Sequence, residues 1–285
     1  MFYNFFLWDF RPTPCSDAIA VMAALFSRRL VVRKVILPRL IDQTKYAIVL
    51  ENVFSSDECK AMVCESECKG YDTALLNKGG GREELETKIR KSQRCIIDKI
   101  EYADTIWARV KDFVPTCWKH RKEDWHVVGL NERLRFLRYN PGDYFIPHFD
   151  GTYERPNGDR SFLTIQLYLN QDFEGGETTF PIQPRVRLPL ETEMRQPPLL
   201  HGEPLHDDQL SQSKWPRVSE AVPQEEGEPG TVARLLPKTG QVLIFQHNIF
   251  HGGSIVTMGR KYTLRTDVMY RRATASSATP ERAGS

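Results

Sequence analysis

The stretch that decides the fold reads RYNPGDYFIPHFD, from Arg138 to Asp150. A Pro-Gly turn is followed there by an extended segment in which His148 and Asp150 stand two positions apart. Side chains of an extended chain alternate between its two faces, so this imidazole and this carboxylate project from the same face. The pair can therefore hold one metal ion, and a second imidazole has to come from elsewhere in the chain.

Two histidines further along, His247 and His251, are the candidates for that second imidazole. Both lie in QHNIFHGG, residues 246–253, directly after a buried-looking strand. Two histidines and one carboxylate on one face of an octahedron leave three positions open on Fe(II) for a co-substrate and dioxygen. Lys261 follows His251 by ten positions and opens another strand, and a fixed cation there suits the far carboxylate of a chelating co-substrate. Lys261 therefore favours His251 over His247.

Short segments with a two-residue period predict strands in the second half of the chain. They begin after Asn131 and are bounded by Gly, Pro, Asn or Asp. The expected strands cover residues 134–139, 161–169, 177–180, 241–245 and 262–270.

The first half is expected to be rich in helices. A strand over residues 46–54 precedes Ser55-Ser56-Asp57-Glu58, a helix N-cap with acids in the first turn, and a helix over about 56–69. Helical spacing of apolar residues recurs over residues 100–114. Helices first and strands afterwards favour an α+β fold whose strands close into a sandwich or barrel.

Three segments break this rhythm. Residues 1–44 have no consistent period and are expected to form an appended arm. Residues 182–231 are crowded with Pro, Glu, Gln and Ser and are expected to form a flexible insertion, with His201 and His206 as solvated bystanders. The strands on either side of the insertion should still be neighbours. The small, polar tail 273–285 is expected to be disordered.

The composition is that of a single catalytic domain with extensions. The 285 residues are 40% hydrophobic, and 39 Lys and Arg balance 37 Asp and Glu, so no nucleic-acid partner is expected. The apolar run Ala18–Phe26 is too short for a transmembrane helix. Cys59, Cys64 and Cys68 are interpreted as structural or free thiols and not as a metal cluster. The compartment stays open between the cytoplasm and the lumen of the endoplasmic reticulum.

These motifs occur in an order that resembles a known family. Between about Tyr46 and Tyr270, the sequence is similar to the iron(II)- and 2-oxoglutarate-dependent dioxygenases of the prolyl 4-hydroxylase type. It departs from their usual pattern where His251-Gly252-Gly253 replaces the frequent His-Glu-Gly. The matching elements are Arg138-Tyr139-x-Pro-Gly142, His148-x-Asp150, Leu163-Thr-x-x-Leu-Tyr168-Leu-Asn170, Gly175-Gly-Glu-Thr178, Pro237-x-x-Gly240, His251-Gly252 and Gly259-x-Lys261-Tyr262.

The resemblance implies a double-stranded β-helix, or jelly-roll, core with supporting N-terminal helices, forming a dioxygenase domain over residues 45–272. It implies that iron is bound by His148, Asp150 and His251 and that Lys261 binds the distal carboxylate of 2-oxoglutarate. Tyr139 and Tyr168 match tyrosines that hydrogen-bond this co-substrate in relatives. Arg265 lies on the same strand face as Lys261, four residues on, so it is a second candidate for the carboxylate.

The implied reaction hydroxylates an unactivated C–H bond with Fe(II), dioxygen and 2-oxoglutarate, and it releases succinate and carbon dioxide, with ascorbate as reductant. A peptidyl proline is the first choice of substrate; another protein side chain, a small metabolite or a free amino acid are the alternatives. Two other classes compete with a dioxygenase, a non-catalytic jelly-roll module that binds a structural ion and a zinc hydrolase with an open fourth position. Both leave Lys261 unexplained, and succinate release with Fe(II) separates the three.

Overall fold

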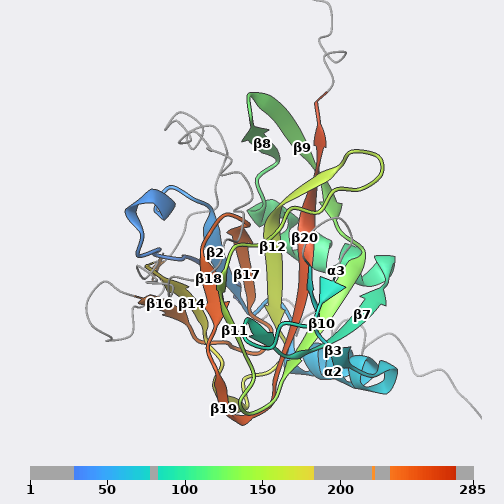
Figure 1. Cartoon of the computed structure of the whole chain (residues 1–285). Helices are drawn as coiled ribbons and strands as arrows, with labels where there is room; N and C mark the ends of the chain where they lie inside the picture. The colour runs from blue at the N-terminus through green and yellow to red at the C-terminus, as the bar shows by residue number, and fades with distance from the viewer. Residues whose placement is uncertain (1–28, 78–82, 183–219, 222–231, 274–285) are drawn as a thin grey trace, which may run out of the picture. The chain divides into compact units, whose positions relative to one another are not determined.

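The computed structural model of the chain describes residues 29–77, 83–182, 220–221 and 232–273 (Figure 1). The chain divides into a unit from Met1 to Leu30 and a second unit from Val31 to Ser285, and the strands and helices below belong to the second. The expectations for most of the arm, for nearly all of the insertion with His201 and His206, and for the tail after residue 273 lie outside the described residues.

The described residues form two α-helices, two short 3-10 helices and many strands. The helices are α2 (Ser56–Lys69) and α3 (Ile100–Val110), and the 3-10 helices are η1 (Leu40–Asp42) and η2 (Lys111–Phe113). The strands are β1 (Val31–Lys34), β2 (Ala47–Glu51), β3 (Asp72–Thr73), β4 (Leu76–Asn77), β5 (Glu83–Glu84), β6 (Arg90–Lys91), β7 (Gln93–Asp98), β8 (Cys117–His120), β9 (Glu123–Leu130), β10 (Arg133–Tyr139), β11 (Tyr144–His148), β12 (Arg160–Tyr168), β13 (Phe173–Gly175), β14 (Thr178–Pro181), β15 (Glu220–Ala221), β16 (Val232–Leu235), β17 (Val242–Gln246), β18 (His251–Gly253), β19 (Val256–Gly259) and β20 (Lys261–Arg272).

Two sheets carry the architecture. The main sheet has the order β15-β1-β2-β17-β12-β20-β10-β7-β3, with β9 on β20 and β8 on β9. The second sheet has the order β16-β14-β18-β11-β6. Along the chain the strands change sheets repeatedly: β10, β12, β17 and β20 lie in the main sheet, and β11, β14, β16 and β18 lie in the second. This winding is the double-stranded β-helix that the sequence analysis expects, so that prediction is confirmed.

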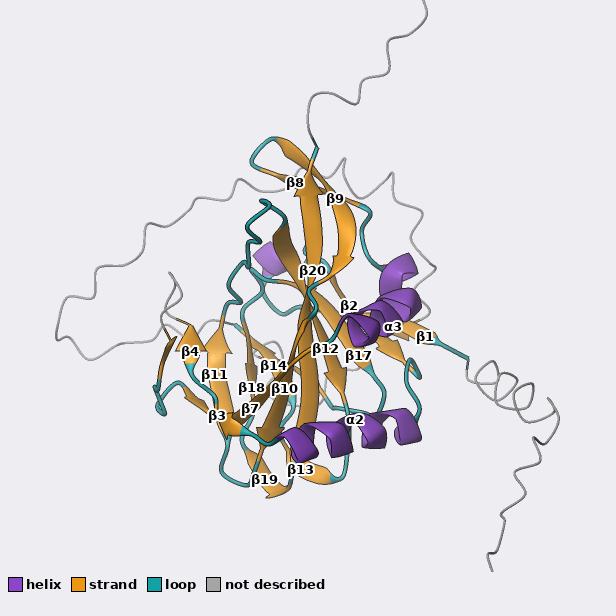
Figure 2. Cartoon of the chain, turned by 90° about the vertical axis from the view of Figure 1, so that its right-hand side faces the viewer, coloured by secondary structure: helices purple, strands orange, loops and turns teal. Residues whose placement is uncertain are grey.

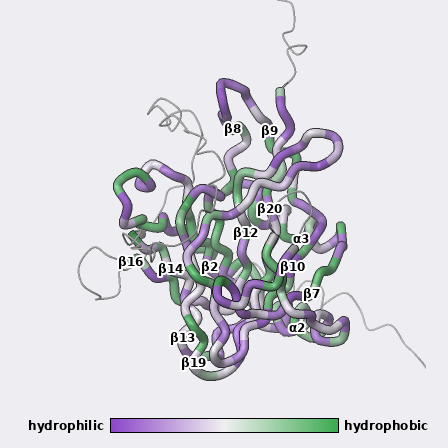
Figure 3. The backbone as a smooth tube through the Cα atoms, in the orientation of Figure 1, coloured by the Kyte–Doolittle hydropathy of each residue, from purple (hydrophilic) through white to green (hydrophobic). Residues whose placement is uncertain are grey.

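A hydrophobic core lies between the sheets. The main sheet contributes Val49, Leu243 and Phe245, and the second sheet contributes Phe180 and Leu235, all of them buried. The rings of Phe180 and Phe245 meet edge to face at a centroid distance of 6.3 Å. In Figure 3 the hydrophobic stretches run through the central strands, while the turn joining β8 and β9 is hydrophilic. The alternation of apolar residues in the sequence therefore indicates which face of each strand is buried.

The two helices form where their capping and spacing predict. Ser55 accepts a hydrogen bond from the backbone N–H of Glu58 at 3.1 Å, and the Glu58 carboxylate accepts one from the backbone N–H of Ser55 at 2.8 Å, which is a capping box. The helix expected over residues 100–114 ends as an α-helix at Val110 and continues as η2. Both helices lie on the same side of the main sheet (Figure 2). None of the helices in the described part of the chain is long and apolar enough to cross a membrane.

The structure differs from the sequence analysis in the first half of the chain. Val31–Lys34 falls inside the expected arm, yet its Val-Val pair forms a strand antiparallel to β2. The expected helix-rich half also contains the strands β3 to β9. Several of these are only two residues long or carry charges at many positions, so they lack the apolar alternation that marks a strand in sequence. The expectation for the insertion's flanks is confirmed, because β14 pairs with β16 directly.

Candidate metal centre

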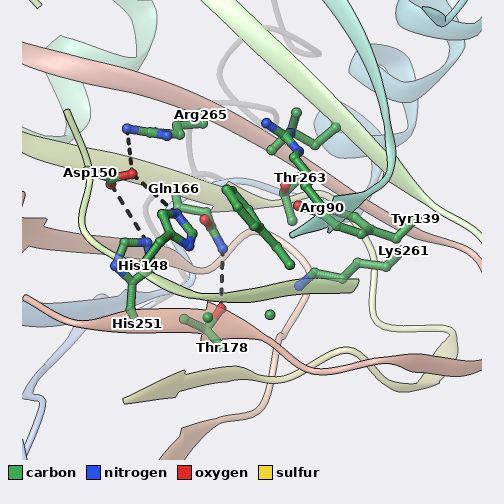
Figure 4. A pocket seen from close by; sticks show the side chains of 14 residues that line it. Arg90, Tyr139, His148, Asp150, Gln166, Thr178, His251, Lys261, Thr263 and Arg265 are labelled. Atoms are coloured by element: carbon green, nitrogen blue, oxygen red, sulfur yellow. Dashed lines mark hydrogen bonds and ion pairs between the residues drawn. The ribbon is translucent and has the colours of Figure 1, made fainter. Parts of the chain in front are cut away.

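Three side chains from neighbouring segments converge in one pocket between the two sheets. His148 at the end of β11 stands directly opposite His251 at the start of β18. Asp150 follows β11 and lies 3.6 Å from His148 (Oδ1 to Nε2) and 3.8 Å from His251 (Oδ2 to Nε2). The donor atoms of the three residues all fall within 4.8 Å of one another. Figure 4 shows the three side chains pointing at a common point.

The backbone fixes which ring nitrogen of each histidine faces the centre. His148 Nδ1 lies 2.9 Å from the carbonyl oxygen of Ile146, and His251 Nδ1 lies 3.0 Å from that of Ile249. Since a carbonyl oxygen only accepts, Nδ1 of each histidine carries a proton, and in the neutral ring Nε2 is then the atom that presents a lone pair. Burial lowers the pKa of His251 to about 4. His251 is therefore a neutral donor at physiological pH, as metal binding requires.

Asp150 is buried but ionised. Thr164 Oγ1 donates a hydrogen bond of 2.6 Å to its Oδ2, and Arg265 Nη2 lies 2.9 Å from its Oδ1. Burial by itself would raise the pKa of Asp150, but Arg265 and the two histidines outweigh this effect and hold the pKa well below its usual range. The carboxylate is thus fixed in its negative form next to the two Nε2 atoms.

The structure places Arg265 beside Asp150. On the other side of its guanidinium lies the buried Asp267, with 3.6 Å between Nη2 and Oδ1, and Asp267 pairs in turn with Arg135 at 3.1 Å. Burial would lower the pKa of Arg265, but Asp150 and Asp267 outweigh it and raise that pKa. Arg135, Asp267 and Arg265 therefore form a row of alternating charges that ends at Asp150 and stabilises its carboxylate.

Lys261 lies in the same pocket and forms no ion pair with an acid among the described residues, although the charge of Glu177 acts on it from a distance. Its side chain is buried, and its Nζ donates a hydrogen bond of 2.6 Å to the carbonyl oxygen of Gly176. Burial lowers the pKa of Lys261 to about 8. Gly176 has φ +68°, and a Cβ there would come within 3.2 Å of Lys261 Cδ, so glycine is required for this approach. The ammonium is thus held rigidly and is available to an anion.

The two tyrosines expected near a co-substrate occupy different positions. Tyr139 stands opposite Lys261 in the strand register and lines the pocket. Tyr168 is completely buried, and its hydroxyl lies 2.6 Å from Thr178 Oγ1. Thr178 and Gln166 line the pocket, and Gln166 donates a hydrogen bond of 3.3 Å to Thr178. The roles expected for Tyr139 and Tyr168 stay predictions.

His247 lies behind the three converging side chains. Its carbonyl oxygen accepts a hydrogen bond from the backbone N–H of Asp150 at 3.0 Å, and its Nε2 lies 3.7 Å from Asp267 Oδ1. Among the described residues, His148, Asp150 and His251 form the one group suited to a metal. The helix α2 presents Cys64 and Cys68 at its surface and buries Cys59, and all three are free thiols.

Four residues of this pocket escape the sequence analysis. Arg90, Gln166, Thr178 and Thr263 line it, and Thr164 binds Asp150 from outside. Thr178 and Thr164 stand inside motifs that the sequence shows, so their spacing from Gly175 and Leu163 is a usable signal. Arg90 has no such signal, because it comes from the two-residue strand β6.

Comparison with known proteins agrees with this geometry. Residues 134–266 match the family model described as the 2OG-Fe(II) oxygenase superfamily. This part of the chain belongs to that superfamily. Within the superfamily, the chain is similar to prolyl 4-hydroxylase 1 of Arabidopsis thaliana, with 23% identity over 148 residues, covering 51% of this chain and 50% of that protein. It is also 28% identical over 138 residues to the probable prolyl 4-hydroxylase 4 of the same plant, covering 47% of this chain and 43% of that protein.

The matches cover the oxygenase domain and not the whole of either protein. The chain spans half or less of the length of these curated relatives. Among solved structures, the viral collagen prolyl hydroxylase of Paramecium Bursaria Chlorella virus-1, in its 2OG complex, aligns with a TM-score of 0.46 and 19% identity over 81% of this chain and 99% of that chain.

Proposed function

We propose that this protein is an Fe(II)- and 2-oxoglutarate-dependent dioxygenase that hydroxylates a peptidyl proline and releases succinate and carbon dioxide. Ascorbate is the proposed reductant. The observation that carries the proposal is the occurrence, in one pocket, of the His148, Asp150 and His251 donors together with the ammonium of Lys261, which has no ion-pair partner in the described part of the chain. A metal site alone would suit many functions, whereas a metal site that faces a buried cation suits a chelating dicarboxylate.

The donor set fits Fe(II). Two imidazole nitrogens and one carboxylate oxygen converge from one side, which is the two-histidine, one-carboxylate arrangement that leaves positions open for other ligands. When bound, iron supplies the redox chemistry that activates dioxygen and breaks the C–H bond.

The protein's own residues bind the metal and 2-oxoglutarate, orient them and shield them from water. The Nε2 atoms of His148 and His251 are pre-oriented by backbone carbonyls, so little reorganisation accompanies metal binding. Lys261, whose side chain is buried, holds the distal carboxylate of 2-oxoglutarate through a charge-assisted hydrogen bond. The Phe145 ring lines the pocket, stacks on the His148 ring at a centroid distance of 3.6 Å and covers that side of the ligand from water.

A peptide is the proposed class of substrate because the relatives are prolyl 4-hydroxylases. Phe149 and Ile146, near the ligands on the chain, are exposed apolar residues that an extended peptide would cover.

Alanine substitution of the ligands tests the proposal. We expect His148→Ala, Asp150→Ala and His251→Ala each to abolish succinate formation from 2-oxoglutarate, because each removes a donor and disturbs the geometry of the others. His247→Ala is the matched control, since it removes a neighbouring buried imidazole and should leave most of the activity. The same proteins are mixed with Fe(II) and 2-oxoglutarate without oxygen to look for the weak visible band of the chelate. An active His251→Ala with an inactive His247→Ala would show that the distal ligand is His247.

A further inference from the structure

Arg90 is a cation of the pocket that the proposed reaction does not use. It lies on β6, the last strand of the second sheet, opposite Phe145 of β11. Its guanidinium lies over the Phe145 ring at 4.8 Å, and that ring stacks on His148 at a centroid distance of 3.6 Å. Arg90 is therefore joined to a metal ligand through a single side chain, at the border of the pocket.

The guanidinium of Arg90 is only partly satisfied. Its Nε donates a hydrogen bond of 2.8 Å to Ser92 Oγ, but its Nη2 is buried and has no hydrogen-bond partner among the described residues. No acid in that part of the chain forms an ion pair with it. Burial lowers the pKa of Arg90, and the nearby cations Arg265 and Arg94 act in the same direction, whereas the hydroxyl of Tyr139, a neutral hydrogen-bond partner, acts against them. A buried charge without a partner costs free energy, which a bound anion would offset.

The charges of the pocket leave room for one more anion. Its lining has three cations, Arg90, Lys261 and Arg265, and one carboxylate, Asp150, which neutralises Arg265 by direct contact. A divalent metal and the dianion 2-oxoglutarate neutralise each other. The filled pocket therefore keeps an excess of positive charge, and Arg90 is the cation to which no anion is assigned.

We propose that Arg90 binds a carboxylate of the substrate, so that the substrate class is acidic: a peptide with Asp or Glu at, or next to, the oxidised residue. This inference rests on the proposed function, because iron and 2-oxoglutarate fill the rest of the pocket. Both carboxylates of 2-oxoglutarate already have partners, the metal for one and Lys261 for the other. A carboxylate suits Arg90 better than a phosphate does, since the one free nitrogen of a planar guanidinium meets a single planar anion.

A small anion tests the site without knowledge of the substrate. The full chain is loaded with Mn(II) and saturating 2-oxoglutarate, and the paramagnetic relaxation of the methyl protons of acetate and of acetamide is titrated. Acetate should bind saturably and acetamide should not. Arg90→Gln should weaken acetate about 10- to 150-fold, the effect of losing one charge-assisted hydrogen bond. Arg90→Lys should recover part of the loss.

Lys91→Gln is the matched control. Lys91 is the next residue of β6, its Nζ lies 3.4 Å from Asp143, and its side chain is 55% exposed, so the substitution removes a neighbouring charge outside the pocket. Acetate affinity should change less than about threefold. Equal binding of acetate and acetamide, or normal acetate binding by an Arg90→Gln protein that still binds Mn(II), would overturn the inference. Weaker 2-oxoglutarate binding in Arg90→Gln, with acetate unaffected, would assign Arg90 to the co-substrate and overturn it as well.

Peptides then test the substrate class. Two pools of capped peptides, degenerate at all positions except a central Glu in one and Gln in the other, are compared for the succinate that they add to the turnover without substrate. The Glu pool should stimulate more, and Arg90→Gln should abolish the difference. A Gln pool that stimulates as well as, or better than, the Glu pool contradicts the inference, as does no stimulation by either. Failure of the proposed function itself is distinct, because the Fe(II) and 2-oxoglutarate band would then be absent.

Discussion

Lys261 and Arg265 share one face of β20, yet their surroundings give them different tasks. Lys261 has a carbonyl oxygen as its hydrogen-bond partner, whereas Arg265 stands between Asp150 and Asp267. A cation held between two carboxylates has little attraction left for a third, and an ammonium facing a neutral oxygen retains it. The geometry therefore supports Lys261 as the anchor of the distal carboxylate, and Arg265 as a support of Asp150.

The depressed pKa of Lys261 predicts a pH dependence of co-substrate binding. Burial lowers this pKa to about 8, so the ammonium is charged below pH 8 and loses its proton as the pH rises above it. Binding the carboxylate requires the charged form. We expect the affinity for 2-oxoglutarate, measured anaerobically with Mn(II), to be constant near pH 7 and to fall up to about tenfold per pH unit above about 8.

Two variants test whether Lys261 causes this pH dependence of 2-oxoglutarate binding. Lys261→Arg keeps its charge at every accessible pH, so its affinity should not fall between pH 8 and 9.5. Lys261→Ala should bind 2-oxoglutarate about 10- to 150-fold more weakly at pH 7 and still bind metal. An unchanged pH profile in Lys261→Arg would show that another group titrates.

Arg265 is expected to affect the metal more than the co-substrate. Arg265→Ala removes the donor that fixes Oδ1 of Asp150, and loss of such an outer partner weakens metal binding or activity about 10- to 100-fold. The affinity for 2-oxoglutarate should change by less than about threefold. Arg135→Ala, which removes one partner of Asp267 and no contact of Asp150, is the control and should have a smaller effect on metal binding. Normal metal binding together with lost 2-oxoglutarate binding would instead identify Arg265 as the anchor.

Sequence patterns identify functional residues that have to lie close to one another along the chain. His148 and Asp150 must be two apart on one strand, and His251 and Lys261 follow in an order that such a pocket imposes, so all four can be proposed from the sequence. Arg90 contributes through the register of β6 with β11, which depends on long-range pairing. No local pattern encodes that register, and the residue is found only in the folded chain.

At the level of elements, the pairing of β14 with β16 should allow the insertion between them to be shortened without loss of the fold. Phe180 stands opposite Ala233, and Pro181 stands opposite Val232, so the two strands already form an antiparallel pair at the point where the insertion leaves and returns. Replacing residues 185–228 by a short Gly-Ser linker should preserve folding and the turnover of 2-oxoglutarate without substrate, because shortening a loop changes its closure entropy little. Circular dichroism and succinate release measure the two outcomes.

A second deletion separates the insertion from its one described strand. Glu220–Ala221 forms β15, which pairs in parallel with β1. Deleting residues 185–217 keeps β15, whereas deleting 185–228 removes it, so a difference in stability between the two proteins measures what β15 contributes. Insoluble protein in both cases would show that the deleted residues are needed for the domain to fold.

Long or well-buried helices and strands can be predicted from the sequence more readily than short or charged ones. The helix α2 carries its start signal in Ser55 and Glu58, and β17 carries an uninterrupted buried run, so both are visible in the sequence. The strands β8 and β9 carry the charged residues Lys119, Glu123 and Asp124 close to the turn that joins them, so this part of the sequence resembles a loop. Their pairing with each other and with β20 determines them, and such pairing is a tertiary property.

Over the whole molecule, the candidate metal centre lies where the two sheets meet. His148 and His251 belong to the second sheet, while Lys261 and Arg265 belong to the main sheet. A ligand that binds both groups at once connects the two layers across the core. Binding energy gained at the site is therefore available to the stability of the folded domain, because the unfolded chain has no such site.

This linkage predicts that metal and co-substrate raise the unfolding temperature. A ligand present at a hundred times its dissociation constant stabilises the folded state by about 2.7 kcal/mol, and a domain of this size gains about 2 to 4 °C per kcal/mol, so we expect a rise of about 5 to 10 °C. Mn(II) with 2-oxoglutarate in differential scanning fluorimetry measures it, and a chelator should reverse it. Asp150→Ala should lose the whole shift, and Lys261→Ala should lose only the part that 2-oxoglutarate adds. His247→Ala should keep both parts, since His247 lies behind Asp150 and its side chain is not among the converging donors. A shift that persists in Asp150→Ala would mean that the metal stabilises the protein from another site.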